Sequence, residues 1–116
     1  MSAYIISDVG PVPPGAEDAW KAYLERAPAA IARYGGRYLA RGGAIEVFEG
    51  DWSPNAIVLV EFPDMEAVKR WYASPEYAEA LKIREGRLQR KLIAVEGTDG
   101  GAAGLLSAKV MVQDEG

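Results

Sequence analysis

The chain has 116 residues and a formal net charge of −4, so it fits one domain and carries no cationic excess. It contains neither histidine nor cysteine, which excludes disulfides, thiolate nucleophiles, typical zinc sites and histidine-ligated haem. Because its basic residues are scattered and no acidic cluster typical of Mg²⁺ or Ca²⁺ sites occurs, we expect no nucleic-acid partner, no metal and no cofactor.

The first part of the chain predicts a strand followed by a helix. Residues 3–9 are rich in β-branched and aromatic side chains and end at a Gly-Pro pair. In residues 17–34 apolar side chains recur at helical spacing, and Gly35-Gly36 supply the expected helix end. The apolar run at the N-terminus is interpreted as a strand and not as a signal peptide, and no apolar run reaches the ~20 residues that span a bilayer, so we expect a cytoplasmic protein without a membrane partner.

The glycine pair Gly42-Gly43 separates two strand-like runs and is open to three interpretations: a phosphate-binding loop, the tip of a hairpin, or a bulge. No helix follows that could direct its amides at a phosphate. The hairpin loop is already supplied by EGDWSPN, residues 49–55. We therefore expect one long second strand in which the glycines permit a bulge or kink.

The remaining elements alternate in the same way. Residues 55–62 form a nearly continuous apolar run, which is typical of a central strand buried on both faces. Asp64 is expected to cap a helix over residues 65–73, and Ser74-Pro75 to begin a second helix that ends at Gly86. Residues 88–96 return as the last strand.

This order predicts an α+β fold with a ferredoxin-like βαββαβ protomer, in which the helices cover one face of an antiparallel sheet. Since the strand over 55–62 is apolar on both faces, we expect a second copy of the sheet to cover the other face in a homodimer. The domain is expected over residues 1–97. Residues 98–116 are expected to form a Gly-rich C-terminal tail that packs on a sheet edge or on the dimer partner.

Several pieces of sequence resemble, in this order, a family named domain of unknown function 1330: AYIISDV, GGRYLARGG, EVFEGDW, LVEFPDMEAVKRWYASPEY and LIAVEG. The resemblance covers roughly residues 2–97. It implies membership of the dimeric α+β barrel superfamily, with sheets paired into a barrel-like dimer, and it implies no established reaction. Superfamily relatives include cofactor-independent monooxygenases, muconolactone-type isomerases and haem-handling enzymes.

Strand alternation suggests one charged pair. It places Arg41 on the same face as Arg37, and a hairpin over 49–55 would bring Arg41 close to Glu61 on the next strand. Such a pair could hold an anionic or carbonyl-bearing ligand. A structural ion pair at the end of the sheet is the alternative, and the one we favour.

Large aromatic side chains are numerous, and their helical spacing favours core packing over a pocket. If a pocket exists, Trp71 and Tyr77 are the first candidates, because they flank the break between two predicted helices. The basic stretch near the last strand, which includes Arg84 and Arg90, is interpreted as a solvated rim. No catalytic residue or metal ligand is assigned, and the candidate pocket residues are Tyr4, Tyr38, Arg41, Glu61, Trp71 and Tyr77.

Two functions follow from these observations. The first, which we favour, is a small soluble homodimer that binds a small apolar or aromatic ligand between sheet and helices. The alternative is a cofactor-independent monooxygenase- or isomerase-like enzyme that acts on a small organic substrate. A cavity into which Arg41 or Glu61 points would favour the enzyme, whereas a filled interior with both charges at the solvent edge would favour a non-catalytic module.

Overall fold

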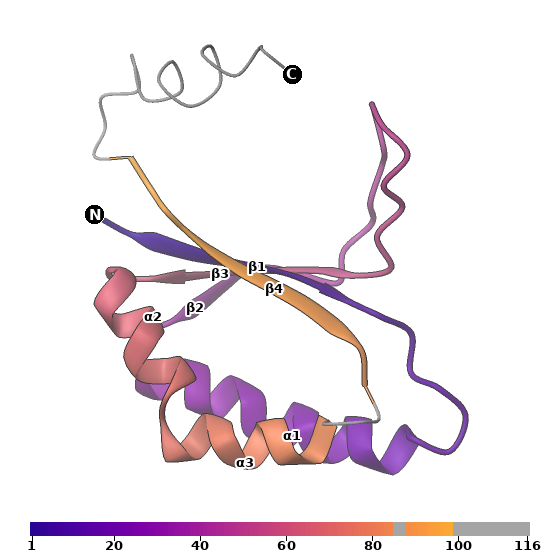
Figure 1. Cartoon of the computed structure of the whole chain (residues 1–116), viewed down its shortest axis with the longest axis horizontal. Helices are drawn as coiled ribbons and strands as arrows, with labels where there is room; N and C mark the ends of the chain where they lie inside the picture. Colours follow the sequence, from indigo (N-terminus) through magenta and orange to yellow (C-terminus); the bar gives the residue numbers. More distant parts are fainter. Residues whose placement is uncertain (85–87, 99–116) are drawn as a thin grey trace, which may run out of the picture.

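Within residues 1–84 and 88–98, which the computed structural model describes, four strands form one antiparallel sheet in the order β2-β3-β1-β4 (Figure 1). The strands are β1 (Ala3–Val9), β2 (Arg37–Arg41), β3 (Ile57–Phe62) and β4 (Arg90–Glu96). The helices are α1 (Glu17–Arg33), α2 (Met65–Tyr72) and α3 (Pro75–Arg84). This order of elements confirms the predicted α+β, ferredoxin-like protomer.

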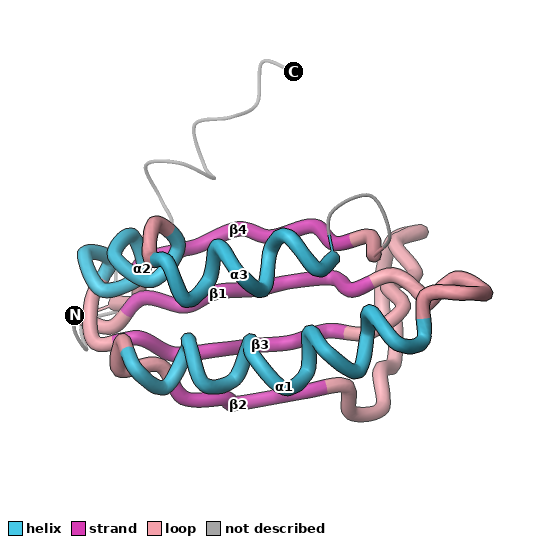
Figure 2. Tube along the Cα trace, turned by 90° about the horizontal axis from the view of Figure 1, so that it is seen from below, coloured by secondary structure: helices cyan, strands magenta, loops and turns pink. Residues whose placement is uncertain are grey.

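All three helices lie on one face of the sheet. Figure 2 shows α1 running along β2 and β3 while α3 runs along β1 and β4, and α1 packs against α3. No described helix covers the opposite face, which we call the open face. None of the described helices is long and apolar enough to cross a membrane.

The core lies between the sheet and the helices. Ile5 of β1 and both Val60 and Phe62 of β3 are buried there, because alternate residues of a strand point to the same face. Trp71 and Tyr77 meet them from the helix side, and their ring centres lie 4.5 Å apart.

The two short helices begin where the sequence predicts. The Asp64 carboxylate accepts a hydrogen bond of 2.8 Å from the Ala67 amide at the start of α2. The Ser74 hydroxyl accepts one of 3.0 Å from the Tyr77 amide at the start of α3. The predicted helix end at Gly86 and the predicted packing of the C-terminal tail lie outside the described residues.

The second strand is shorter than predicted. β2 ends at Arg41, and residues 43–56, which we call the arm, contain no strand. The Gly42 amide donates the last bond of the β2–β3 ladder, to the Ile57 carbonyl, and its positive φ of 76° then turns the chain out of the sheet. The bulge lies earlier than expected, between Tyr38 and Ala40.

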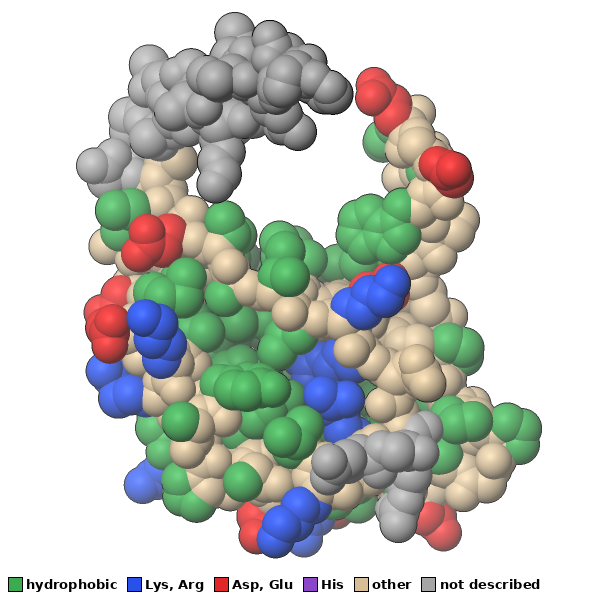
Figure 3. Space-filling model, viewed as in Figure 1, with side chains coloured by type: hydrophobic (Ala, Val, Ile, Leu, Met, Phe, Trp, Pro, Cys, Tyr) green, Lys and Arg blue, Asp and Glu red, His purple; other side chains and the backbone are tan. Residues whose placement is uncertain are grey.

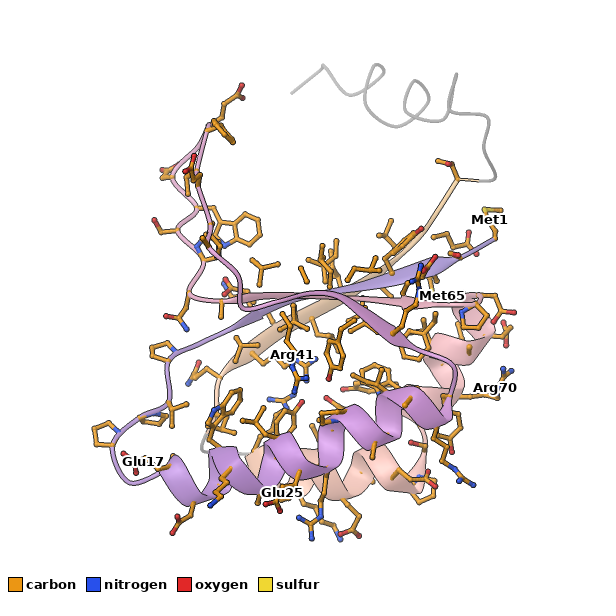
Figure 4. The ribbon with its side chains drawn as sticks, turned by 180° about the vertical axis from the view of Figure 1, so that it is seen from behind. Met1, Glu17, Glu25, Arg41, Met65 and Arg70 are labelled. Atoms are coloured by element: carbon orange, nitrogen blue, oxygen red, sulfur yellow. The ribbon has the colours of Figure 1, made fainter. Side chains whose placement is uncertain are left out.

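The arm rises away from the helices on the open-face side (Figures 1 and 4). Its base is fixed to the end of β1, because Asp8 accepts hydrogen bonds from the Trp52 indole at 3.2 Å and from the Asn55 amide at 3.1 Å. The Asn55 side chain also donates to the Val9 carbonyl at 2.8 Å. These bonds join the base of the arm to the sheet where β1 ends and β3 begins.

Candidate functional site

A cavity of about 310 Å³ lies between the helix-covered face of the sheet and α1. Its walls come from α1, from the chain after β1, and from the adjacent ends of β2, β3 and β4. Most of the lining is apolar, with a few polar groups among it, as is typical of small-molecule sites. The principal apolar and aromatic residues are Val12, Trp20, Leu24, Ala27, Pro28, Ile31 and Val58, and the polar ones are Tyr23, Tyr38, Arg41, Asn55 and Arg90.

Arg41 reaches this cavity because of the bulge in β2. The extra residue breaks the alternation of the strand, so that Arg41 pairs with Val58 and lies on the helix-covered face together with Tyr38. The guanidinium carbon lies 4.4 Å from the centre of the Tyr38 ring. Figure 4 shows Arg41 extending from β2 toward α1. Since Arg41 remains exposed to solvent, it stands at the cavity mouth.

The predicted proximity of Arg41 and Glu61 is wrong. The register pairs Glu61 with Arg37, and the Arg37 Nη2 and Nε atoms lie 2.7 and 2.8 Å from Glu61 Oε1. This pair belongs to the open face, where the Ser2 hydroxyl donates to Glu61 at 2.8 Å and the Tyr4 hydroxyl lies 3.5 Å away. Hydrogen bonds from Ser2 and Arg37 lower the pKa of the Glu61 carboxyl.

The aromatic candidates are divided between the core and the cavity. Trp71 and Tyr77 are 1% and 0% exposed, so they belong to the core and do not form the mouth of this cavity. Trp71 also borders a second hollow of about 570 Å³ beside β4. The lining of this hollow includes Arg84, which directly precedes residues 85–87, and the structure does not describe those residues. The cavity beside α1, whose lining lies apart from that gap, is therefore the candidate site.

Arg90 lines the cavity, and the sequence interpretation did not include it among the candidate pocket residues. It is not part of a solvated rim, because it joins β4 to both long helices: Nη1 donates to the hydroxyls of Tyr23 on α1 and Tyr77 on α3, the latter at 3.2 Å. Nη2 donates to the buried Ser7 hydroxyl at 3.3 Å. The available signal was its even spacing from Leu92, which packs against the core.

The charged side chains in the described lining of the cavity are both positive, Arg41 and Arg90. Burial raises the pKa of the Tyr23 phenol far above its usual range, and the Arg90 cation offsets only part of this rise. Burial also raises the pKa of Tyr38, against the opposing charges of Arg41 and Arg90. Both phenols are therefore neutral near pH 7, while the two guanidinium groups keep their charge. No aspartate or glutamate occurs among the described residues that line the cavity.

Groups of three or more acidic side chains that could hold a metal ion do not occur in residues 1–84 and 88–98. What the cavity offers chemically is an apolar wall, neutral hydroxyl groups and two fixed positive charges. Such a set binds and orients a molecule through shape, hydrogen bonds and charge.

The fold is shared with solved structures of low sequence identity. A protein of unknown function from Rhodopseudomonas palustris has a TM-score of 0.65 and 20% identity, over 84% of this chain and 82% of that one. A dimeric ferredoxin-like protein of unknown function from Jannaschia sp. has a TM-score of 0.61 and 14% identity, over 84% of this chain and 100% of that one. An uncharacterized NIPSNAP domain protein from Burkholderia xenovorans has a TM-score of 0.51 and 12% identity, over 88% of this chain and 99% of that one. These similarities establish the fold alone.

The sequence itself gives one match to a family model and none to a curated protein. The model is that of the domain of unknown function DUF1330, and it matches residues 2–98. This span includes every described strand and helix and all residues that line the cavity. The chain therefore belongs to the DUF1330 family, as the resemblance of its sequence motifs implied.

Proposed function

We propose that this protein is a homodimer that binds a small organic molecule, with an apolar or aromatic body, in the cavity between the sheet and α1. The observation that carries the proposal is the cavity itself, which is about 310 Å³ in volume. Ligand sites are concave and mostly apolar, with few polar groups, and this cavity has that composition.

The wall along α1 suits a flat ligand. Trp20 and Tyr23 stack with their ring centres 6.0 Å apart and their planes inclined by 17°. Leu24, which follows them on the helix, lines the cavity and is exposed. A planar apolar body placed against these side chains would remove apolar surface from water, which stabilises the complex by roughly 25 cal/mol per Å².

The open face supports the dimer. Ile93 and Val95 of β4 are 62% and 47% exposed, and Phe48 of the arm is 88% exposed. Figure 3 shows hydrophobic side chains along the side of the sheet that faces away from the helices, beside the arm. Apolar patches of this kind mark interaction surfaces. The Jannaschia protein of the same fold is described as dimeric.

An enzyme that acts on a small organic substrate is the second candidate. The cavity and the position of Arg41 at its mouth favour it. Glu61, the carboxylate that was expected to orient the substrate, lies on the other face of the sheet. Because the described lining has arginine, tyrosine and asparagine but no carboxylate to act as a general base, binding is the function that the site supports better.

Filling the cavity tests the proposal. Ala27 lines the cavity from α1, whereas Ala29 on the same helix is exposed and lies outside it. We expect the neutral fluorophore phenylnaphthylamine to bind the wild type and Ala29→Leu with equal affinity, because the Ala29→Leu substitution does not alter the cavity. Ala27→Leu should weaken binding by about tenfold or more, since the added methylene groups occupy the ligand's space. Equal binding by all three proteins, or no binding by the wild type, would refute the proposal.

A further inference from the structure

Neither arginine of the cavity forms an ion pair with a described acidic side chain. Outside the cavity, Arg33 pairs with Glu76 at 3.0 Å and Arg37 pairs with Glu61 at 2.7 Å. No described acidic side chain lies within ion-pair distance of Arg41 or Arg90. A chain with a net charge of −4 thus keeps two cations at one cavity and no described acid in its lining.

Arg90 is held in place by neutral groups. The described acceptors of its hydrogen bonds are the hydroxyl oxygens of Tyr23, Tyr77 and Ser7, and no carboxylate is among them. The Arg90 Nε atom is buried and has no hydrogen-bond partner among the described residues. The cluster is therefore rich in donors and short of acceptors, and its positive charge is not neutralised by the residues described around it.

Arg41 directs a second cation to the same place. Its guanidinium lies over the Tyr38 ring, and the charges of both Arg41 and Arg90 act on the Tyr38 hydroxyl. The two cations thus line the same cavity, Arg41 from β2 at its mouth and Arg90 from β4. The apolar side chains of α1, among them Trp20 and Leu24, lie along the rest of the cavity.

From this arrangement we infer that the ligand of the cavity is an organic acid, whose carboxylate lies between Arg41 and Arg90 and whose apolar body lies along α1. The inference rests on the proposed function and adds the ligand's chemical class. A carboxylate supplies the acceptors that the cluster lacks, and its planar shape matches the paired N–H groups of a guanidinium. A singly charged group also suits the small, mostly apolar space better than a phosphate does.

The test compares an acid with its neutral counterpart on the full-length protein. Naphthoate and naphthamide share the same aromatic body and differ in charge. Isothermal titration calorimetry at pH 7.5 should give a dissociation constant for naphthoate about tenfold or more below that for naphthamide, because hydrogen bonds to charged groups contribute about twice as much as neutral ones. Naphthyl phosphate should bind more weakly than naphthoate.

Variants assign the effect to the arginines. Arg41→Met should weaken naphthoate binding by far more than naphthamide binding, because only naphthoate loses a charged partner. The affinity of Arg41→Lys for naphthoate should lie between those of the wild type and Arg41→Met, because lysine keeps the charge but loses the paired N–H groups of arginine. Arg26→Met is the matched control, since Arg26 is exposed on α1 outside the cavity, and it should bind both probes as the wild type does. Arg90→Lys, used only if its thermal unfolding remains cooperative, should weaken naphthoate selectively as well.

The outcomes separate this inference from the proposed function. Equal affinities for naphthoate and naphthamide, with phenylnaphthylamine still bound, would overturn the organic acid and leave the cavity as a neutral-ligand site. An equal loss of both probes in Arg41→Met would also overturn it, since shape rather than charge would then be responsible. If none of naphthoate, naphthamide and phenylnaphthylamine binds the protein, the inference and the proposed function are overturned together.

Discussion

At the scale of single residues, the contact that organises the site is Arg90 with its hydroxyl acceptors. It links β4 to α1 and α3 through Tyr23 and Tyr77, and to β1 through Ser7. The geometry of the cavity interior therefore depends on polar contacts inside an otherwise apolar core. Networks of this kind stabilise a single arrangement when every member has a partner, and they are costly when one partner is removed.

Removal of one acceptor should reveal that cost. Tyr77→Phe deletes the buried hydroxyl that accepts from Arg90, and we expect the free energy of unfolding to fall by about 1–3 kcal/mol. Tyr72→Phe is the control, because Tyr72 is exposed and makes no hydrogen bond through its hydroxyl in the described residues; it should change stability little. Urea unfolding followed by circular dichroism measures both. Equal stabilities for the two variants would show that the bond contributes nothing measurable.

At the scale of elements, the junction between α1 and β2 depends on a close approach that only glycine permits. A Cβ atom on Gly36 would lie 2.6 Å from Ile31 Cγ2 and 2.9 Å from two ring atoms of Phe62. Gly36, in the link between α1 and β2, therefore lies against Ile31 of α1 and Phe62 of β3. We expect this contact to hold the C-terminal end of α1 near β3.

Gly36→Ala should consequently destabilise the protein by about 1–3 kcal/mol, which is the usual cost of overpacking a core. Gly43→Ala provides the matched control, because a Cβ atom there meets nothing within 4 Å and the residue has no positive φ. Thermal unfolding should show a lower midpoint for Gly36→Ala and a midpoint near that of the wild type for Gly43→Ala. A wild-type midpoint for Gly36→Ala would mean that the contact relaxes without cost.

Most elements could be predicted from the sequence because their signals are local. The Asp64 and Ser74 caps, the helical spacing in α1 and the apolar run of β3 each depend on neighbouring residues. Local signals fail where tertiary packing decides. The bulge between Tyr38 and Ala40 reverses the face of Arg41, and nothing in the order of residues 37–41 reveals it. The early end of β2 at Arg41 was missed for the same reason.

The candidate site was predicted less well than the fold. Of the six proposed residues, Tyr38 and Arg41 line the cavity, whereas Trp71 and Tyr77 are packed in the core and Tyr4 and Glu61 lie on the open face. Helical spacing shows which face of a helix is apolar, but it does not tell a pocket wall from a core. The even spacing of Arg90 from Leu92 indicated its face, but its hydroxyl partners Tyr23 and Tyr77 lie on other elements, and no local signal reveals them.

At the scale of the whole molecule, the open face should unite two copies of the chain. Ile93 pairs with Ile6 on this face and is 62% exposed in the protomer. Native mass spectrometry should report a dimer for the wild type and a monomer for Ile93→Glu, because a buried unpaired charge opposes association. Ala32→Glu, on the exposed surface of α1, should remain dimeric. A monomeric wild type, or a dimer that survives Ile93→Glu, would contradict this assignment of the interface.

The central claim is that the cavity between the sheet and α1 holds an organic acid, and a crystal structure with bromonaphthoate tests it most directly. The anomalous signal of bromine locates the aromatic body without reference to any model of the ligand. Our account predicts a bromine peak against Trp20 and Leu24, with the carboxylate between Arg41 and Arg90. A bromine peak on the open face, or an empty cavity in crystals grown with saturating bromonaphthoate, would contradict it.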